Sequence, residues 1–185
     1  MNKSVKRVWN AISWILVFCV VVLAVLLGGI RLVGLKPYAV ISGSMEPAYH
    51  VGSLIYVKTV PPEKIQVGDP ITFVLNEDLV VATHRVIQID PENQSFYTKG
   101  DANDAPDGAP VHFNNLVGKP VFTIPNLGYL STWITNPPGT YIAICAAGIL
   151  LLLFFLPELL DKAEAADKKA EARKKETSDR SGSNT

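Results

Sequence analysis

A serine on a glycine-bearing turn is the first residue of this 185-residue chain whose surroundings suggest chemistry. Residues 41–47, Ile-Ser-Gly-Ser-Met-Glu-Pro, interrupt a segment rich in branched and aromatic side chains. Such a turn can present Ser44 to a cleft as a nucleophile, while nearby backbone N–H groups stay available to an oxyanion. Serine and glycine also mark ordinary turns, so on these residues alone a plain turn is the simpler interpretation.

A histidine beside an arginine lies forty residues further on, within an apolar segment. His84 and Arg85 follow Leu-Val-Val-Ala-Thr at residues 79–83 and precede Val86 and Ile87. An unperturbed histidine has a pKa of about 6.5, so a buried neutral imidazole can accept a serine proton near neutral pH, typically worth ~10²–10⁴ in rate. A strand histidine that is merely satisfied by a backbone carbonyl would have the same sequence pattern.

Three aspartates crowd residues 98–108, a loop that also contains Gly and Pro: Asp101, Asp104 and Asp107. One such carboxylate can accept the second N–H of a histidine, fix its tautomer and stabilise the imidazolium. The aspartates could equally bond their own backbone in turns or form a loose calcium loop, although that spacing is imperfect and lacks the closing glutamate. Serine, histidine and aspartate on separate segments therefore form a triad hypothesis that geometry must test.

These segments lie among short runs that predict β-strands between residues 31 and 138. Each run is rich in branched and aromatic residues and is bounded by Gly, Pro, Asn or Asp. The predicted strands are Tyr38–Ile41, Leu54–Val60, Ile71–Leu75, Leu79–Thr83, Val86–Ile89, Phe96–Thr98 and Val117–Ile124. Turns are predicted at residues 61–62, 76–78 and 90–93. No segment here has a helical period long enough to compete, so we expect a compact antiparallel β domain.

Charge is sorted along the chain, although 17 basic residues balance 17 acidic ones. Residues 1–8 carry three basic charges, residues 9–30 carry none of either sign, and residues 31–138 carry seven basic against ten acidic charges. The uncharged stretch of 22 residues is long enough to cross a ~30 Å hydrocarbon core and too long for the core of a cleaved signal peptide. We expect an uncleaved signal anchor, and the balanced total gives no support to a nucleic-acid partner.

A second apolar run occupies residues 139–157. Its uninterrupted part, Tyr141–Leu156, has only sixteen residues before Pro157 and Glu158. It is therefore either a second span or an interfacial or buried helix. If both runs cross, the positive-inside rule puts both termini in the cytoplasm and residues 31–138 outside. Residues 158–185 then form a cytoplasmic charged helix, with pairs such as Glu158 and Lys162, and a disordered tail from Ser178.

The fold class predicted from these patterns is mainly β: a small antiparallel β domain flanked by an N-terminal and a C-terminal transmembrane helix. The expected segments are a basic N-terminus at 1–8, the anchor at 9–30, the β domain at 31–138, the second span at 139–157 and the charged end at 158–185. Cys19 and Cys145 both lie in apolar runs, so their positions suggest neither a disulfide in the β domain nor a metal site.

Three motifs resemble those of the type I signal peptidases, peptidase family S26: SGSMEP around Ser44, HRV from His84, and TKGD with a further aspartate. VGDPITFV resembles the strand that the family places between the first two, with Pro70 as a departure that the first position of a strand tolerates. The resemblance covers roughly residues 10–125. A histidine where another branch has lysine makes the chain similar to the endoplasmic-reticulum-type branch, which also occurs in archaea and Gram-positive bacteria.

The resemblance implies a role for each motif residue. Ser44 would attack the scissile carbonyl, and His84 would act as general base and then as general acid. Asp101 or Asp107 would orient His84, with a slight preference for Asp107, whereas Asp104 matches neither family position. The Ser44 amide and the Ser42 hydroxyl would form the oxyanion hole.

The family's substrate lies extended between two strands, which correspond here to Tyr38–Ser42 and Leu79–Thr83. This arrangement is strand addition, with shallow pockets for small side chains at the cleaved position and two residues before it. The residues expected to contact substrate are Tyr38, Val40, Ile41, Met45, Val80, Val81 and Ala82.

The resemblance implies a membrane-bound serine endopeptidase of the plasma membrane that removes signal peptides from secreted precursors after a small-x-small site, without metal or cofactor. Its expected partners are those precursors, the lipid bilayer and an export-machinery or accessory subunit. The alternative from another class is a membrane-tethered extracytoplasmic β module that binds a peptide or envelope protein without cutting it. His50 and His112 match no catalytic position, which leaves a three-histidine metal site with His84 as their remaining use.

Overall fold

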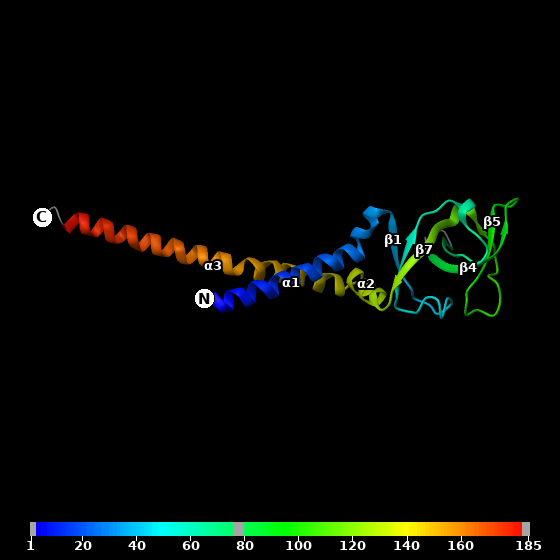
Figure 1. Cartoon of the computed structure of the whole chain (residues 1–185), viewed down its shortest axis with the longest axis horizontal. Coiled ribbons are helices and arrows are strands. Elements are labelled where there is room, and N and C mark those ends of the chain that lie inside the picture. The colour runs from blue at the N-terminus through cyan, green and yellow to red at the C-terminus, as the bar shows by residue number, and fades with distance from the viewer. Residues whose placement is uncertain (1–2, 76–79, 183–185) are drawn as a thin grey trace. The chain divides into compact units, whose positions relative to one another are not determined.

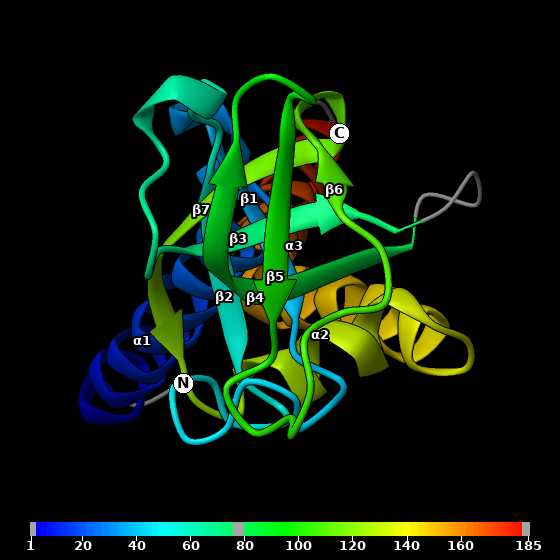
Figure 2. The same ribbon diagram turned by 90° about the vertical axis from the view of Figure 1, so that its right-hand side faces the viewer.

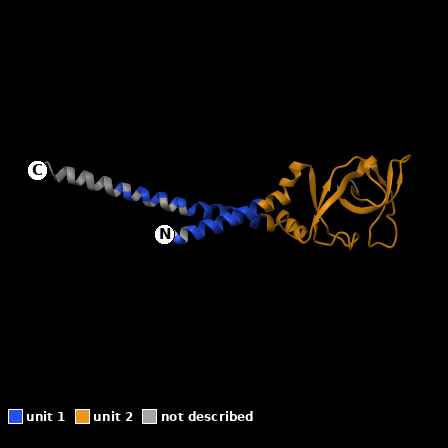
Figure 3. Cartoon of the chain, viewed as in Figure 1, with its two compact units in different colours: residues 1–21, 141–185 blue, residues 22–140 orange. Residues whose placement is uncertain are grey.

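The computed structural model of the chain describes residues 3–75 and 80–182. The turn predicted at residues 76–78 and Leu79, the first residue of a predicted strand, lie outside the described residues, as do residues 183–185. The described chain divides into two compact units, coloured separately in Figure 3.

The β unit, residues 22–140, is built on an antiparallel sheet of seven strands (Figures 1 and 2). The strands are β1 (Leu35–Ala39), β2 (Leu54–Lys58), β3 (Pro70–Val74), β4 (Val81–Asp90), β5 (Ser95–Lys99), β6 (Val111–His112) and β7 (Leu116–Ile124), and the 3-10 helices are η1 (Gly29–Val33), η2 (Pro62–Lys64) and η3 (Phe113–Asn115). Their order in the sheet is β1-β2-β7-β3-β4-β5-β6. The predicted fold class, an antiparallel β domain with an apolar helix at each end of the chain, is confirmed.

Strand β4 differs most from the sequence prediction, because it joins two predicted strands into one of ten residues. Its first half pairs with β3 through Arg85, and its second half pairs with β5 from Arg85 onward. The polar pair His84 and Arg85 therefore lies where the strand passes from one neighbour to the other, instead of marking a break. Strand β6, of two residues, was not predicted because so short a segment has no readable period.

The core of the β unit includes consecutive residues of the central strands. Thr72 on β3 is 0% exposed, and its neighbours Ile71 and Phe73 are 0% and 2% exposed. Ile71 and Phe73 form one cluster with buried apolar residues of the neighbouring strands and loops: Ile65, Val86, Phe96 and Val111. This packing gives β3 and β4, which carries His84, a rigid foundation.

Helix α2 (Leu127–Thr135) corrects the expectation that residues 31–138 contain no helix. Its nine residues are too few for a clear helical period, and its position depends on a tertiary contact instead. A Cβ added at Gly128 would lie 2.3 Å from the carbonyl oxygen of Ser53 and 2.7 Å from that of Gly52. Glycine therefore lets the helix backbone lie directly against the backbone of Gly52 and Ser53, which precede β2 in sequence.

The helical unit, residues 1–21 and 141–185, contains most of α1 (Lys3–Leu27) and α3 (Gly139–Gly182). Segments Arg7–Leu27 and Gly139–Leu156 are long and apolar enough to cross a membrane, with mean hydropathies of 2.7 and 2.4. The first helix ends at Leu27, three residues before the predicted end of the anchor, where two glycines follow.

Helix α3 continues through Pro157, where the sequence suggested a boundary. A proline inside a helix removes one backbone hydrogen bond, and here the helical assignment is unbroken across it. Glu158 and Lys162 form the predicted ion pair at 2.8 Å. The helix reaches Gly182 and so includes residues 178–182, which the sequence assigns to a disordered tail; the high density of Ala, Glu and Lys before them favours a helix.

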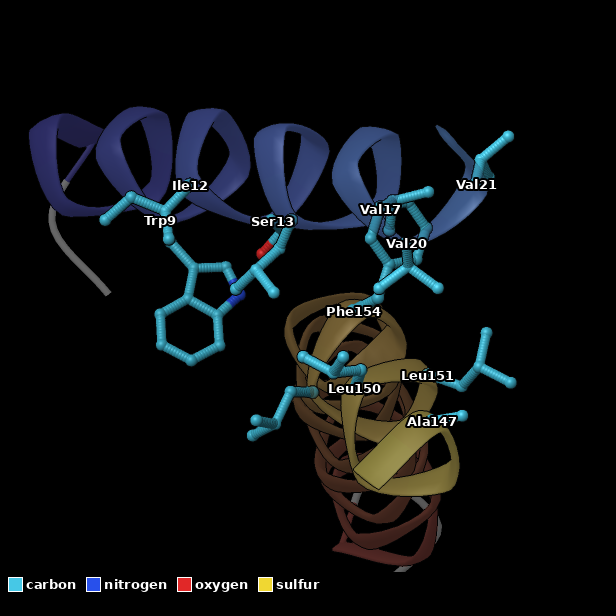
Figure 4. Close-up of a pocket in the computed structure, with 12 residues that line it drawn as sticks. Trp9, Ile12, Ser13, Val17, Val20, Val21, Ala147, Leu150, Leu151 and Phe154 are labelled. Atoms are coloured by element: carbon cyan, nitrogen blue, oxygen red, sulfur yellow. The ribbon is translucent and has the colours of Figure 1, made fainter. Parts of the chain in front are cut away.

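Within the helical unit, α1 and α3 contact each other through large apolar side chains. The rings of Trp14 and Phe154 meet edge to face with centroids 5.5 Å apart. A cavity of about 270 Å³ lies nearby, and Figure 4 shows side chains from both helices around it, including Trp9, Val17 and Leu150. Close van der Waals packing of this kind is how membrane helices associate.

Candidate active site

Ser44 lies on a turn that follows β1 and is anchored on both sides. Before it, the Val40 N–H donates to the Ser53 carbonyl at 2.9 Å, which extends the pairing of β1 with β2. After it, the Met45 side chain is 3% exposed and fixes the turn to the interior of the β unit. Ser44 itself is half-buried, so its hydroxyl is held at a defined place and remains accessible.

His84 connects the serine to an aspartate. Its Nε2 lies 3.1 Å from Ser44 Oγ, and its Nδ1 lies 2.6 Å from Asp107 Oδ2. With the proton on Nδ1, the ring donates to the Asp107 carboxylate and accepts from the Ser44 hydroxyl through Nε2. A nucleophile bonded to a base that is itself oriented by a carboxylate is the geometry of acyl transfer by a serine triad.

Asp107 is held by β5 as well as by His84. Thr98 donates from its Oγ1 to Asp107 Oδ2 at 2.6 Å, and the Asp107 N–H donates to the Thr98 carbonyl at 2.9 Å. Thr98 is only 1% exposed, so this support belongs to the core of the sheet. This role of Thr98 could not be predicted from the sequence, because a threonine in a strand carries no signal of what it bonds.

Asp101, the other candidate acid, binds a different partner. Arg85 donates to it from Nε at 2.7 Å and from Nη2 at 2.6 Å, and also donates from Nη1 to the Gly68 carbonyl at 2.8 Å. The hydrogen bonds from Arg85 lower the pKa of Asp101, against the opposing effect of burial. The structure therefore places Asp107 on His84 and Asp101 on Arg85, while Asp104 is exposed.

The aspartate loop also holds the nucleophile turn. The Ala102 N–H donates to the Ser44 carbonyl at 2.9 Å. A Cβ added at Gly100 would lie 2.6 Å from the same carbonyl oxygen, so this close approach of two backbones needs glycine. Ser42 Oγ lies 3.3 Å from Ser44 Oγ, which puts the second expected oxyanion donor next to the nucleophile.

A cavity of about 350 Å³ opens beside Ser44 and His84. Its lining includes all the residues expected to contact substrate: Tyr38, Val40, Ile41, Met45, Val80, Val81 and Ala82. It also includes Tyr49 and Asn103, which sequence reasoning did not assign to the site. Asn103 was visible in the sequence between two of the aspartates, but an amide in a loop gives no independent indication of a site.

Two strand edges border this cavity. Val40 bonds toward β2, so the alternation of an antiparallel ladder directs the backbone groups of Ala39 and Ile41 to the opposite side. On β4, Val80 accepts from the Leu75 N–H at 2.8 Å, which by the same alternation turns Val81 outward. Among the described residues, the pairing of β4 with β5 begins only at Arg85. An extended peptide could therefore bond to both edges.

The other two histidines lie apart from this cavity. His50 pairs with Glu46 through Nδ1, and His112 accepts from the Asn114 N–H through its Nδ1 at 3.1 Å. Among residues 3–75 and 80–182, no three His, Cys, Asp or Glu side chains are grouped as metal ligands would be. The hypothesis of a three-histidine metal site with His84 therefore has no support in the described chain.

Comparisons with known proteins point to one family. A profile described as "Signal peptidase, peptidase S26" matches residues 11–100, which include Ser44 and His84 but end before Asp107. The chain is 46% identical to signal peptidase I W of Bacillus subtilis over 81 residues, 42% of either protein. It is 30% identical to the signal peptidase complex catalytic subunit SEC11 of Zygosaccharomyces rouxii over 123 residues, 60% of this chain and 71% of that one.

The human relative, signal peptidase complex catalytic subunit SEC11C, is 27% identical over 125 residues, or 62% of this chain and 65% of that protein. The match to the Bacillus protein spans less than half of its length. With these relatives, the two long apolar helices of the chain indicate a membrane protein.

Proposed function

Because the chain belongs to the signal peptidase family, peptidase S26, we propose that it is a membrane-bound serine endopeptidase that removes signal peptides from precursor proteins. The observation that carries this proposal is the bonded series of Ser44, His84 and Asp107, at 3.1 Å and 2.6 Å. A β module that only binds peptides has no use for a hydroxyl bonded to a carboxylate-supported imidazole. The non-catalytic alternative is therefore the weaker explanation of the site.

The reaction follows from these contacts. Ser44 Oγ attacks the scissile carbonyl while His84 Nε2 takes its proton, and the Asp107 carboxylate stabilises the imidazolium that forms. The Ser42 hydroxyl and the Ser44 N–H stabilise the oxyanion, where the loss of one donor typically costs ~10²–10³ in rate. His84 then protonates the leaving amine as the scissile C–N bond breaks, which leaves the acyl ester on Ser44. A water whose proton His84 accepts attacks this ester, and His84 returns the proton to Ser44 Oγ as the ester bond breaks.

The substrate would bind as an added strand between the edges of β1 and β4. Backbone groups of Ala39, Ile41 and Val81 supply hydrogen bonds that any sequence can use, which suits an enzyme that must accept many precursors. Side chains of the bound strand that point into the catalytic cavity meet Tyr38 and Met45. We propose that this space selects small residues at the cleaved position and two residues before it.

We also propose that the chain crosses the plasma membrane twice, with both termini in the cytoplasm and the β unit outside. Arg7 and the basic residues after Pro157 support this orientation through the positive-inside rule. The names of the SEC11 relatives place those proteins in a complex, which supports an accessory subunit as a further partner of this chain.

The test uses the full chain, purified in detergent, and a precursor with a small-x-small site. We expect cleavage at that site, and we expect Ser44→Ala and His84→Ala each to abolish it. His112→Ala is the matched control, because this histidine is exposed and lies apart from the site. Undiminished cleavage by the Ser44 or His84 variant would refute the assignment.

A further inference from the structure

A second apolar groove lies beside the same end of β1 as the catalytic cavity. Its volume is about 480 Å³, and it shares Ala39, Val40 and Ile41 with that cavity. Its other walls come from Val51 and Gly52, from α2, and from the segment that follows α2: Gly128, Tyr129, Thr132, Trp133, Asn136, Pro137 and Pro138. The two hollows are therefore continuous along one short segment of chain.

The register of β1 and β2 places successive side chains of β1 on opposite faces of the sheet. Tyr38 pairs with Ile55, and both line the catalytic cavity. Ala39 pairs with Leu54, so these two side chains point to the other face. Helix α2 packs beside β1 (Figure 1) and β2. Gly128 of this helix lies against the backbone of Gly52 and Ser53, which precede β2. The second groove, whose lining includes α2 residues but neither Tyr38 nor Ile55, therefore extends from the shared residues 39–41 toward the α2 side of the sheet.

A peptide strand added to the edge of β1 would present its side chains to both faces in turn. If the cleaved residue and the one two before it point into the catalytic cavity, the residues one and three before the cleaved residue point to the α2 side. We propose that the groove between α2 and residues 39–41 is a second substrate subsite that receives these alternate side chains. The inference rests on the proposed function and adds a specificity determinant to it.

The lining fixes the chemistry that this subsite would accept. It contains no Lys, Arg, Asp or Glu, and its exposed surface is largely apolar. Ile41, Tyr129 and Trp133 are 83%, 59% and 47% exposed, so they offer contact area that an apolar side chain of the substrate would cover. Leucine or an aromatic residue should be favoured there, and a charged residue should be rejected because the groove offers it no partner.

The experiment measures kcat/KM of the purified full chain on peptides that keep the small-x-small site and differ only three residues before the cleaved one. We expect leucine to exceed aspartate by about tenfold, in the range that a hydrophobic pocket achieves. A third peptide has lysine at this position. Thr132→Glu puts a carboxylate on the wall of the groove and should raise kcat/KM for the lysine peptide relative to that for the leucine peptide. Trp133→Ala should reduce the leucine preference, whereas Leu130→Ala, on the same helix but outside the lining, should leave it unchanged.

Each result bears on one of two claims. Equal cleavage of all peptides by an enzyme that Ser44→Ala inactivates would overturn the subsite and leave the proposed function intact. If Trp133→Ala lowers kcat/KM equally for all peptides and this variant also binds phosphatidylcholine vesicles more weakly, the groove contacts lipid. That result would also overturn the subsite. No cleavage of any peptide would overturn the proposed function and this inference together.

Discussion

Replacing each of two aspartates in the same loop by asparagine tests which of them supports His84 in the proposed reaction. Asp107 contacts His84 Nδ1 at 2.6 Å, whereas Asp101 accepts two hydrogen bonds from Arg85. Both changes remove one negative charge, keep the side-chain size and lie within residues 98–108. They therefore differ mainly in the partner that loses the charge.

The expected magnitude for Asp107→Asn follows from the charge that develops on His84. An imidazolium and a carboxylate about 4 Å apart, centre to centre, interact by about 4 kcal/mol at an effective dielectric of ~20. Because 1.36 kcal/mol is about tenfold in rate, kcat should fall about 10³-fold. An asparagine that turns its amide toward His84 would impose the wrong tautomer and bring the loss toward about 10⁴-fold.

Asp101→Asn should lower kcat less than about tenfold, because the pair with Arg85 is partly exposed and exposed pairs contribute roughly 1 kcal/mol or less. The assay is single-turnover cleavage of a precursor, with circular dichroism to show that each variant is folded. If Asp101→Asn proves as damaging to kcat as Asp107→Asn in a folded protein, the assignment of Asp107 as the orienting acid is wrong.

Two further variants, and the pH dependence of Asp101→Asn, test how the β unit and the site are supported. Gly128→Ala should destabilise the β unit by about 1–3 kcal/mol in urea unfolding, because the added Cβ would lie 2.3 Å from a backbone oxygen in front of β2; an unchanged midpoint would contradict this close contact. Thr98→Val should lower kcat by about tenfold with little change in KM, since it removes a charge-assisted hydrogen bond to Asp107, and equal kcat would exclude a positioning role. The pKa of Asp101 is lowered by its hydrogen bonds from Arg85, so its contribution to stability is complete above the unfolded pKa of about 3.9 and is lost as pH falls through the folded value. Asp101→Asn should therefore weaken the loss of unfolding free energy between pH 5 and pH 2, and a variant with the wild-type slope in urea titrations would refute the linkage.

Ser44 and His84 could be singled out from sequence because each lies in a recognisable local pattern, and the resemblance of their motifs to those of the signal peptidases supplied their expected roles. Ser44 lies on a turn with glycine, and His84 interrupts an apolar run. The choice between Asp101 and Asp107 had no such signal, since both are aspartates in one loop. It depends on Thr98 and Arg85, whose side chains reach those acids only after β4 and β5 have paired.

The elements that sequence reasoning missed were those that depend on contacts distant in sequence. Helix α2 is nine residues long, and its place is fixed by the approach of Gly128 to the backbone in front of β2. Strand β4 was divided at His84 and Arg85 because polar residues break an apolar pattern, although their side chains face a cavity and a carboxylate. Hydrophobic periodicity predicts strands on the assumption that polar residues face solvent. The prediction therefore fails where polar side chains point into a functional site.

The aspartate loop explains why the triad cannot be assembled from its motifs alone. Its backbone bonds the Ser44 carbonyl through Ala102, and its far end carries Asp107, which is hydrogen-bonded to His84. One loop therefore sets the position of the nucleophile turn relative to the base. Since a misplacement of about 1 Å can cost roughly 10²-fold in rate, the approach of Gly100 to Ser44 contributes to activity although Gly100 has no side chain to offer.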